Sequence, residues 1–322
     1  MTVVGWAVFS LAQLVWLPVS IIAGVVVGSR QVNGSKERGV SLTAIEVLYG
    51  RFAMHIFGLR DDPASVALVK ALPTTSYLAY WLVMMPLWLS WKVTGTHILY
   101  PTLPAPEDAT PVGLIISRTP VFDDLITRHL DDVSQVVVLG AGMDTRAYGM
   151  LRDSSISIFE LDQGPTQQLK REALESAGIE ADHVTFVPVD FERSDWPEAL
   201  MATSYKPRAK TLFVWEGVTL YLSASDISLT LRLLASHSGT GSVVVADLYS
   251  RRYFASINRT GRRILSATGE DLRFGLDLSS QQDLAVKAFL TSCEVDTSEV
   301  QLLGSHHPKG AFMAVAAMNL PS

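Results

Sequence analysis

Residues 135–150 read QVVVLGAGMDTRAYGM, and this stretch decides the fold. Four β-favouring residues lead into Gly-Ala-Gly, which is typical of a buried strand that ends in a sharp turn. Gly140 and Gly142 let the backbone approach a ligand closely, because neither residue carries a Cβ atom. A dinucleotide-binding fingerprint has a third glycine, but Thr145 stands at that position here. The turn therefore predicts a ligand site of another kind.

Further strand-like runs follow at a regular spacing, with helical stretches between them. The β-rich runs lie at 136–139, 156–161, 184–189, 211–215 and 242–246. The clearest helix begins at Pro165, and Gly178 is expected just past its end. This alternation predicts an α/β domain with a doubly wound, mostly parallel, Rossmann-like sheet that has helices on both faces. We expect residues 310–320 to form a last strand at the sheet edge.

Charge and cysteine content exclude several classes of protein. The chain has 322 residues and a net charge of −6, so it lacks the basic surface of a nucleic-acid-binding protein. Its single cysteine, Cys293, excludes an internal disulfide. His306 and His307 are adjacent rather than four residues apart, and we expect no metal site.

The N-terminal third is strongly apolar. No charged residue occurs in residues 1–29, and this run is long enough to cross a bilayer, which needs about 20 apolar residues. We expect it to be a membrane anchor helix. Basic residues follow it, which favours that flank and the rest of the chain facing the cytosol. A second uncharged run, 71–91, is rich in aromatic residues and is either a membrane contact or a buried helix. Between the two runs, Thr43 and Glu46 could form a capping box at the start of a helix.

Charged residues stand where the predicted strands end. Glu160 and Asp162 end the second strand, 18 to 22 residues after the glycines, where an acid can accept the two hydroxyls of a ribose. Asp190 follows the third strand, where its carboxylate could accept an adenine amino group, and Glu216 follows the fourth. Upstream, a helix begins near Arg118, whose guanidinium can hold a ligand carboxylate. Because parallel strands end at one edge of the sheet, these residues predict one nucleotide site.

The acid in the glycine turn distinguishes two ligands. Asp144 stands at the expected start of a helix, where its carboxylate would repel a pyrophosphate. S-adenosylmethionine carries a sulfonium and an ammonium instead, and Glu216 could pair with the ammonium. The turn therefore favours S-adenosylmethionine as cofactor over NAD(P). An NAD(P)-linked oxidoreductase on a similar fold stays open, as does a non-catalytic, membrane-tethered binding protein.

Five segments in order resemble the leucine carboxyl methyltransferase family, including its secondary-metabolism branch. They are RTPVFDDLI, VVVLGAGMDTRAY, FELDQGPTQQLKREAL, VPVDFE and FVWEGVTLYLS. The resemblance covers residues 111–250 strongly and residues 41–65 more faintly. The chain departs from the family pattern at Gly149, where a second arginine is expected, and in its two hydrophobic runs.

The resemblance implies roles for individual residues. Arg118 would bind the carboxylate of the donor, with Gly140 beneath it, and Glu216 would meet the donor's amino-acid end. Asp162 would bind the ribose. The adenine would be bordered by the two residues after the third strand, Asp190 and Phe191.

Methyl transfer to a carboxylate needs no general base, because that acceptor is already ionised. We therefore expect an O-methyltransferase that esterifies the carboxylate of a lipophilic small molecule. Tyr221 is the best candidate for a contact with this acceptor, although it could equally be a packed aromatic residue. The expected organisation is an anchor helix at 1–29, a helical lid or membrane-associated region at 30–110 and a methyltransferase domain at 111–322. Within the second region, 71–91 is expected to help form the acceptor pocket.

Overall fold

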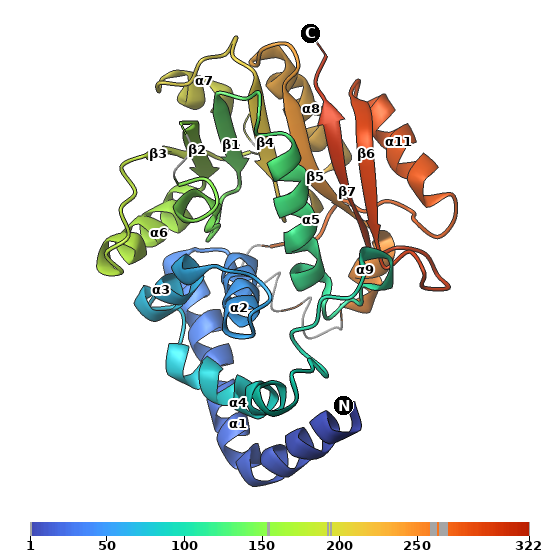
Figure 1. Cartoon of the computed structure of the whole chain (residues 1–322). Helices are drawn as coiled ribbons and strands as arrows, with labels where there is room; N and C mark the ends of the chain where they lie inside the picture. Colours follow the sequence, from blue (N-terminus) through green and yellow to red (C-terminus); the bar gives the residue numbers. More distant parts are fainter. Residues whose placement is uncertain are drawn as a thin grey trace.

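The computed structural model describes residues 2–152, 155–191, 193, 195–257, 263 and 270–321. Its centre is a seven-stranded sheet with the order β3-β2-β1-β4-β5-β7-β6 (Figure 1). The strands β1 to β5 run parallel, and β7 runs antiparallel to both of its neighbours. Their bounds are β1 (Gln135–Leu139), β2 (Ser157–Asp162), β3 (Val184–Pro188), β4 (Thr211–Trp215), β5 (Val243–Tyr249), β6 (Asp296–Leu303) and β7 (Met313–Asn319).

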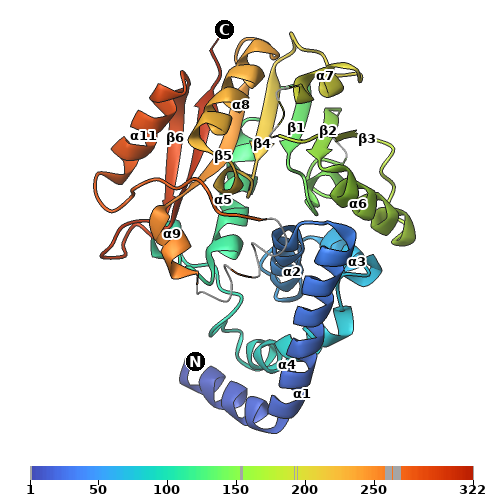
Figure 2. The ribbon, with the colours of Figure 1, turned by 180° about the vertical axis from the view of Figure 1, so that it is seen from behind.

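Helices cover both faces of this sheet, as Figures 1 and 2 show. The α-helices are α1 (Thr2–Arg38), α2 (Leu42–Ile56), α3 (Pro63–Ala71), α4 (Tyr77–Thr94), α5 (Leu114–Arg128), α6 (Gly164–Ser176), α7 (Trp196–Met201), α8 (Ala224–Ser236), α9 (Arg251–Ser256) and α11 (Gln282–Ser292). Single turns of 3₁₀-helix are η1 (Pro106–Asp108), η2 (Arg146–Tyr148) and η3 (Thr219–Tyr221).

Strand β1 shows how the sequence builds two cores. Its five residues are all buried, and alternate side chains of a strand point to opposite faces. Val136 and Val138 belong to a core shared with α5 and α6. Val137 and Leu139 belong to the opposite core, shared with α7, α8 and α11. A strand buried on both faces needs the continuous apolar run that made it recognisable.

The predicted fold class is confirmed, but the prediction for the last strand needs correction and one strand was missed. The expected C-terminal strand forms as β7, but it lies between β5 and β6 rather than at the edge. The edge strand at that side is β6, which the sequence reading missed. Its residues are mostly half-buried and polar, so they lack the apolar run that marked the central strands. Helix α6 agrees well with its prediction, since Gly178 follows its C-cap with a φ of 66°.

The N-terminal helices form a layer beside the carboxyl ends of the parallel strands. Helix α2 shares a core with the sheet, because Ile45, Leu48 and Phe52 are completely buried in it. Helices α1 and α4 pack on each other farther from the sheet (Figures 1 and 2). The predicted capping box is wrong. Ser41 is the N-cap of α2 and accepts a hydrogen bond from the backbone N–H of Ala44.

Candidate functional site

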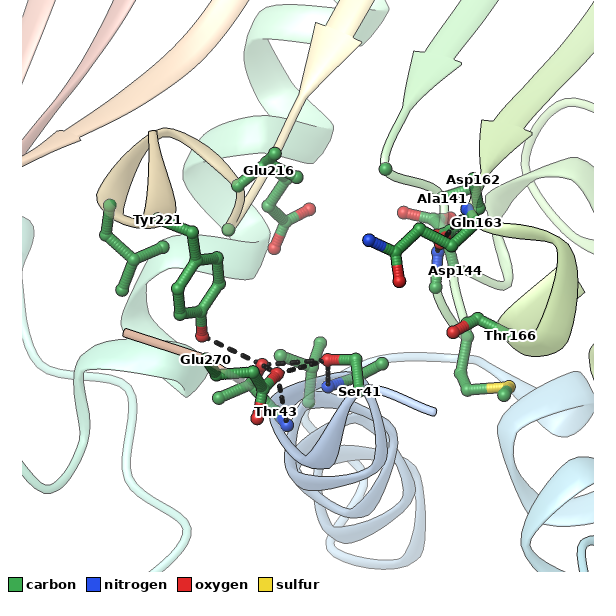
Figure 3. Close-up of a pocket in the computed structure, with 18 of the residues that line it drawn as sticks. Ser41, Thr43, Ala141, Asp144, Asp162, Gln163, Thr166, Glu216, Tyr221 and Glu270 are labelled. Carbon is green, nitrogen blue, oxygen red and sulfur yellow. Dashed lines mark hydrogen bonds between the residues drawn. The ribbon is translucent and has the colours of Figure 1, made fainter. Parts of the chain in front are cut away.

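A cavity of about 450 Å³ lies at the carboxyl ends of β1, β2 and β4, and the start of α2 closes one side of it. Figure 3 shows Asp162 and Gln163 on one side of this space and Tyr221 and Glu270 on the other, with the first turn of α2 between them. All eight residues predicted for the site line the cavity: Arg118, Gly140, Gly142, Asp162, Asp190, Phe191, Glu216 and Tyr221. Their individual roles remain predictions.

The two glycines of the turn are required by space and by backbone conformation. Gly140 has a φ of 65°, and a Cβ atom on it would lie 2.3 Å from the Cγ2 atom of Val218. Gly142 has a φ of 46°, and its Cβ would meet the side chain of Ala44 on α2 at 3.0 Å. One prediction about the turn is wrong, because no α-helix follows it. Among the described residues between β1 and β2, the chain forms only the single 3₁₀ turn η2, so the ligand space has no α-helix beginning at this turn.

Asp162 is fixed by backbone groups at the end of β2. Its carboxylate accepts hydrogen bonds from the N–H of Gly142 at 2.5 Å and from the N–H of Gln163 at 2.6 Å. Burial raises the pKa of Asp162, and these hydrogen bonds act against that rise. A carboxylate offers about four acceptor positions, so two are left for ligand hydroxyls. Glu160 lies elsewhere: it is buried and binds Lys170 Nζ at 2.6 Å.

Arg118 and Glu216 form an ion pair in the lining of the cavity. Arg118 Nε donates to Glu216 at 3.0 Å, and its Nη1 donates to Asp247 at 2.9 Å and to the hydroxyl of Tyr249. Burial alone would raise the pKa of Glu216, but neighbouring arginines, with Arg146 foremost, hold it below its usual range. Asp247 also accepts the backbone N–H of Gly217. Burial raises the pKa of Asp247 to about 6 despite the charge of Arg118.

Asp144 is neutralised by arginines of the protein. Arg51 Nη2 donates to its carboxylate at 2.9 Å, and Arg146 Nη1 donates to it at 2.5 Å. Burial would raise the pKa of Asp144, but these two guanidinium groups hold it well below its usual range. The structure thus corrects the reasoning from the turn. The charge of Asp144 is already balanced, so it gives no ground for choosing between a cationic ligand and a pyrophosphate.

Comparison with known proteins separates the two ligands instead. A sequence profile described as leucine carboxyl methyltransferase matches residues 100–235. A protein of Mycolicibacterium smegmatis, named as a candidate S-adenosyl-L-methionine-dependent methyltransferase, is 30% identical over 234 residues, which is 69% of each chain. The chain belongs to the leucine carboxyl methyltransferase family. The resemblance found in the sequence is confirmed, and so is S-adenosylmethionine as the cofactor expected for this family.

Two further relatives carry the same name and match over a shorter part. A protein of Frankia alni is 38% identical over 140 residues, which is 42% of this chain and 48% of the relative. One of Streptomyces avermitilis is 36% identical over 47% of this chain and 56% of the relative. The chain thus spans about half the length of these two proteins. Among solved structures, an O-methyltransferase family protein of Burkholderia thailandensis has a TM-score of 0.45 at 10% identity, covering 66% of this chain and 58% of that one.

Glu46 and Glu270 are among the acids of the cavity that were not assigned to the site from the sequence of this member of the leucine carboxyl methyltransferase family. Glu270 accepts hydrogen bonds from Ser41, Leu42 and Thr43, all at the start of α2 (Figure 3). Glu46 projects from α2 and is exposed to the cavity. Enclosure by the cavity walls and then the charge of Glu270 raise the pKa of Glu46 to about 7. Glu46 was assigned to a capping box, and Glu270 had no sequence signal because its partners are over 220 residues away.

Tyr221 lies at the opposite end of the cavity from Asp162 (Figure 3). Its hydroxyl donates to the Thr43 hydroxyl at 2.9 Å, which ties η3 to α2. Burial and then the charge of Glu270 raise the pKa of Tyr221 well above its usual value. Its place in the lining keeps it a candidate for a contact with the acceptor.

The second hydrophobic run does not reach this cavity. None of the lining residues comes from 71–91, in contrast to the prediction that this segment helps to form the acceptor pocket. Helix α4 lies one layer behind α2, where Tyr80 stacks on Tyr49 with ring centroids 4.3 Å apart. The wall that was expected from α4 comes instead from residues 39–51.

Proposed function

We propose that this protein is a membrane-attached, S-adenosylmethionine-dependent O-methyltransferase that acts on a lipophilic small molecule. The observation that carries the proposal is one cavity, in a member of this family, that gathers acids from the ends of adjacent strands and an arginine from α5. Asp162 ends β2 and Asp190 follows β3, where they would hold the ribose and adenine, while Arg118 on α5 and Glu216 after β4 would hold the amino-acid end of the donor.

The charges at the donor end suit a zwitterion. Acids and arginines are interleaved there: Asp144, Glu216 and Asp247 pair with Arg51, Arg118 and Arg146, and Arg146 also pairs with Asp123. The amino-acid end of S-adenosylmethionine, with one ammonium and one carboxylate, is itself neutral. Among the described residues, Arg118 makes its hydrogen bonds through Nε and Nη1, which leaves Nη2 to donate to the donor carboxylate.

Catalysis would come from position and exclusion of water. In the reaction, an oxygen lone pair of the acceptor attacks the methyl carbon, and the C–S bond electrons pass to sulfur, which becomes a neutral thioether. Holding both partners at attack distance supplies much of the rate, and an enclosed cavity strengthens the electrostatic interactions around the sulfonium. The side chains beyond the donor, which include Tyr221, Tyr249 and Tyr253, would form the acceptor wall.

Two acceptor classes have support. The family's name and the lack of need for a base favour a carboxylate, which the sequence also favoured. A specific observation favours a hydroxyl: Glu46 faces the cavity, and its raised pKa suits a base near neutral pH. The hydroxyl proton would then pass to the Glu46 carboxylate as the O–CH₃ bond forms.

Membrane attachment is proposed from α1. Within the described residues, it is the one helix long and apolar enough to cross a bilayer, and little of it is buried in the protein. The donor is made in the cytosol, and basic residues follow the apolar run, so we propose that the cavity faces the cytosol. A carbonate wash that releases the protein from membranes would contradict the attachment.

Calorimetry tests the proposal directly. S-adenosylmethionine and its demethylated product are expected to bind with one molecule per chain, and NAD is expected not to bind. Binding of NAD alone would favour the oxidoreductase, and donor binding without transfer would favour a binding protein. To separate the acceptor classes, label from methyl-tritiated donor is followed into a membrane lipid extract. Mild alkali releases labelled methanol from an ester and leaves an ether intact.

A further inference from the structure

Helix α1 carries a long apolar surface that the protein leaves uncovered. Its exposed positions recur at helical spacing, so they form a continuous stripe. The remaining, more buried positions lie on the side that packs on α4. Eleven large apolar side chains of α1 are exposed: Val3, Val4, Trp6, Leu11, Leu14, Val15, Leu17, Ile21, Ile22, Val25 and Val26. Helix α4 adds Leu78, Leu89 and Val93. We call these fourteen side chains the apolar surface. Its size is far beyond scattered exposed residues and indicates a binding surface.

Helix α1 is attached to α4 along its length. The indole N–H of Trp16 donates to the carbonyl of Leu82 at 3.0 Å. Near the N-terminus, the Ser90 hydroxyl donates to the carbonyl of Gly5 at 2.8 Å. At the other end, Arg30 donates to the carbonyl of Thr75 at 3.1 Å. The two helices therefore run antiparallel and are in contact along their length.

Both ends of α1 return to the α2 layer. Its C-terminus leads directly into α2 through Gly39 and Val40. Its N-terminal end meets Ser90, whose neighbour Trp91 packs on Phe57 at the end of α2, with ring centroids 5.6 Å apart. Both views show α1 bent into two arms, which the internal Pro18 explains (Figures 1 and 2).

A helix held in this way cannot cross a bilayer without losing these contacts. Crossing needs about 20 residues, or about 30 Å, that project away from the domain. Here the N-terminal arm instead folds back along α4. In this arrangement, the N-terminus would lie on the same side of the membrane as the cavity.

The charges beside the apolar surface suit an anionic membrane. Arg30 on α1 and Lys92 on α4 are basic, and Lys36, Glu37 and Arg38 follow at the C-terminal end of α1, where Arg38 reaches α6. The whole chain has a net charge of −6, so this region is positive on an otherwise acidic protein. Basic residues beside an apolar helix face are attracted to anionic headgroups, and the exposed Trp6 suits the interface.

We infer that α1 and α4 together form a monotopic membrane-binding surface, which enters one leaflet of an anionic bilayer and does not cross it. The inference rests on the proposed membrane attachment and replaces the crossing helix expected from the sequence. It places the cavity at a fixed height above the leaflet that would supply a lipophilic acceptor.

Vesicle flotation tests the surface. The full-length protein is mixed with two kinds of vesicle. One contains phosphatidylcholine alone, and the other also contains about 30% phosphatidylglycerol, an anionic lipid that tests the electrostatic attraction. It is expected to float with both, and more completely with the anionic vesicles at low salt. The double variant Leu14→Glu and Ile22→Glu should lose flotation, whereas Leu284→Glu, an exposed leucine on α11, should not. If the double variant floats as completely as Leu284→Glu, the inference is overturned.

Topology separates a monotopic from a crossing helix. An epitope tag is placed before Met1, and the protein is bound to sealed vesicles from outside. Protease added outside is expected to remove the tag without detergent. A tag that is protected until detergent is added means that α1 crosses, and the inference fails.

The remaining outcomes are also decisive. If the protein does not float and instead forms a dimer that the double variant dissociates, a second copy covers the surface and the inference is wrong. Calorimetry with the demethylated donor is run on the same preparations. If the wild type binds the demethylated donor but its tag is protected, only the monotopic arrangement is overturned. If the wild type does not bind the demethylated donor, the proposed function is overturned.

Discussion

Arg51 on α2 donates a 2.9 Å hydrogen bond to Asp144 in the turn after β1, and both side chains are buried. This ion pair joins the N-terminal helices to the sheet. It also explains why the two parts of the chain share one cavity, since the same guanidinium reaches Glu216 at 3.2 Å.

Replacing Arg51 should weaken this joint. In Arg51→Ala, Asp144 and Glu216 keep Arg146 as a partner, so we expect a loss of about 1–3 kcal/mol in the free energy of unfolding. Chemical denaturation with and without the demethylated donor measures it. Arg128→Ala, which removes surface pairs with Asp124 and Glu299, is the control and should cost less than about 1 kcal/mol. Similar losses in the two variants would contradict the role of the buried pair.

Asp162 should control donor affinity. Asp162→Ala leaves the ribose hydroxyls without an acceptor, so binding of the demethylated donor should weaken by about 1–3 kcal/mol, roughly 5- to 150-fold. Isothermal calorimetry measures the change, with Glu180→Ala on the surface as the control. Because Asp162 also accepts the N–H of Gly142, Asp162→Asn serves as a milder variant that keeps one acceptor oxygen. Unchanged affinity in Asp162→Ala would remove this residue from the site.

Glu46 should make stability depend on pH. Its pKa rises from 4.5 to about 7 on folding. Between these two pH values, the folded state therefore binds more protons than the unfolded state. The stabilising contribution is therefore fully present below about pH 4.5 and is lost as the pH rises through about 7. Glu46→Gln should resemble the wild type in thermal stability at pH 5 and exceed it at pH 8.

The control for Glu46 is Glu180→Gln, an exposed acid outside the cavity lining. If Glu180→Gln changes thermal stability between pH 5 and pH 8 as much as Glu46→Gln does, the effect is not specific to Glu46. If Glu46 is also the base for a hydroxyl acceptor, the transfer rate should rise with pH through about 7 in the wild type. That rise should be absent in Glu46→Gln.

Glu270 and Ser41 should be coupled in stability. Glu270 accepts from the Ser41 hydroxyl at 2.5 Å and from two backbone N–H groups at the start of α2, where a negative charge is favourable. We expect Glu270→Ala to cost about 1–3 kcal/mol and a double-mutant cycle with Ser41→Ala to give a coupling of at least about 0.5 kcal/mol. Denaturant unfolding of the four proteins measures it. Additive effects would mean that this contact does not hold the cavity wall.

Much of the fold was determined by short stretches of the sequence. Continuous apolar runs predicted β1, β4 and β5, because a strand buried on both faces must be apolar at every position. The glycines were also readable, since a left-handed turn beside Val218 excludes a side chain at Gly140. Edge strand β6 was missed, because a half-exposed strand needs no such run.

The tertiary structure alone decided how the charges of the site are used. Asp144 and its partner Arg51 are 93 residues apart, and Tyr221 and Thr43 are 178 residues apart, so no local pattern records either pair. The sequence thus placed an acid in the turn but could not show that arginines neutralise it. In the same way, it found two apolar runs, whereas only the packing of α1 on α4 shows which face stays uncovered. Composition fixes how apolar a helix is, but burial depends on which distant segments pack against it.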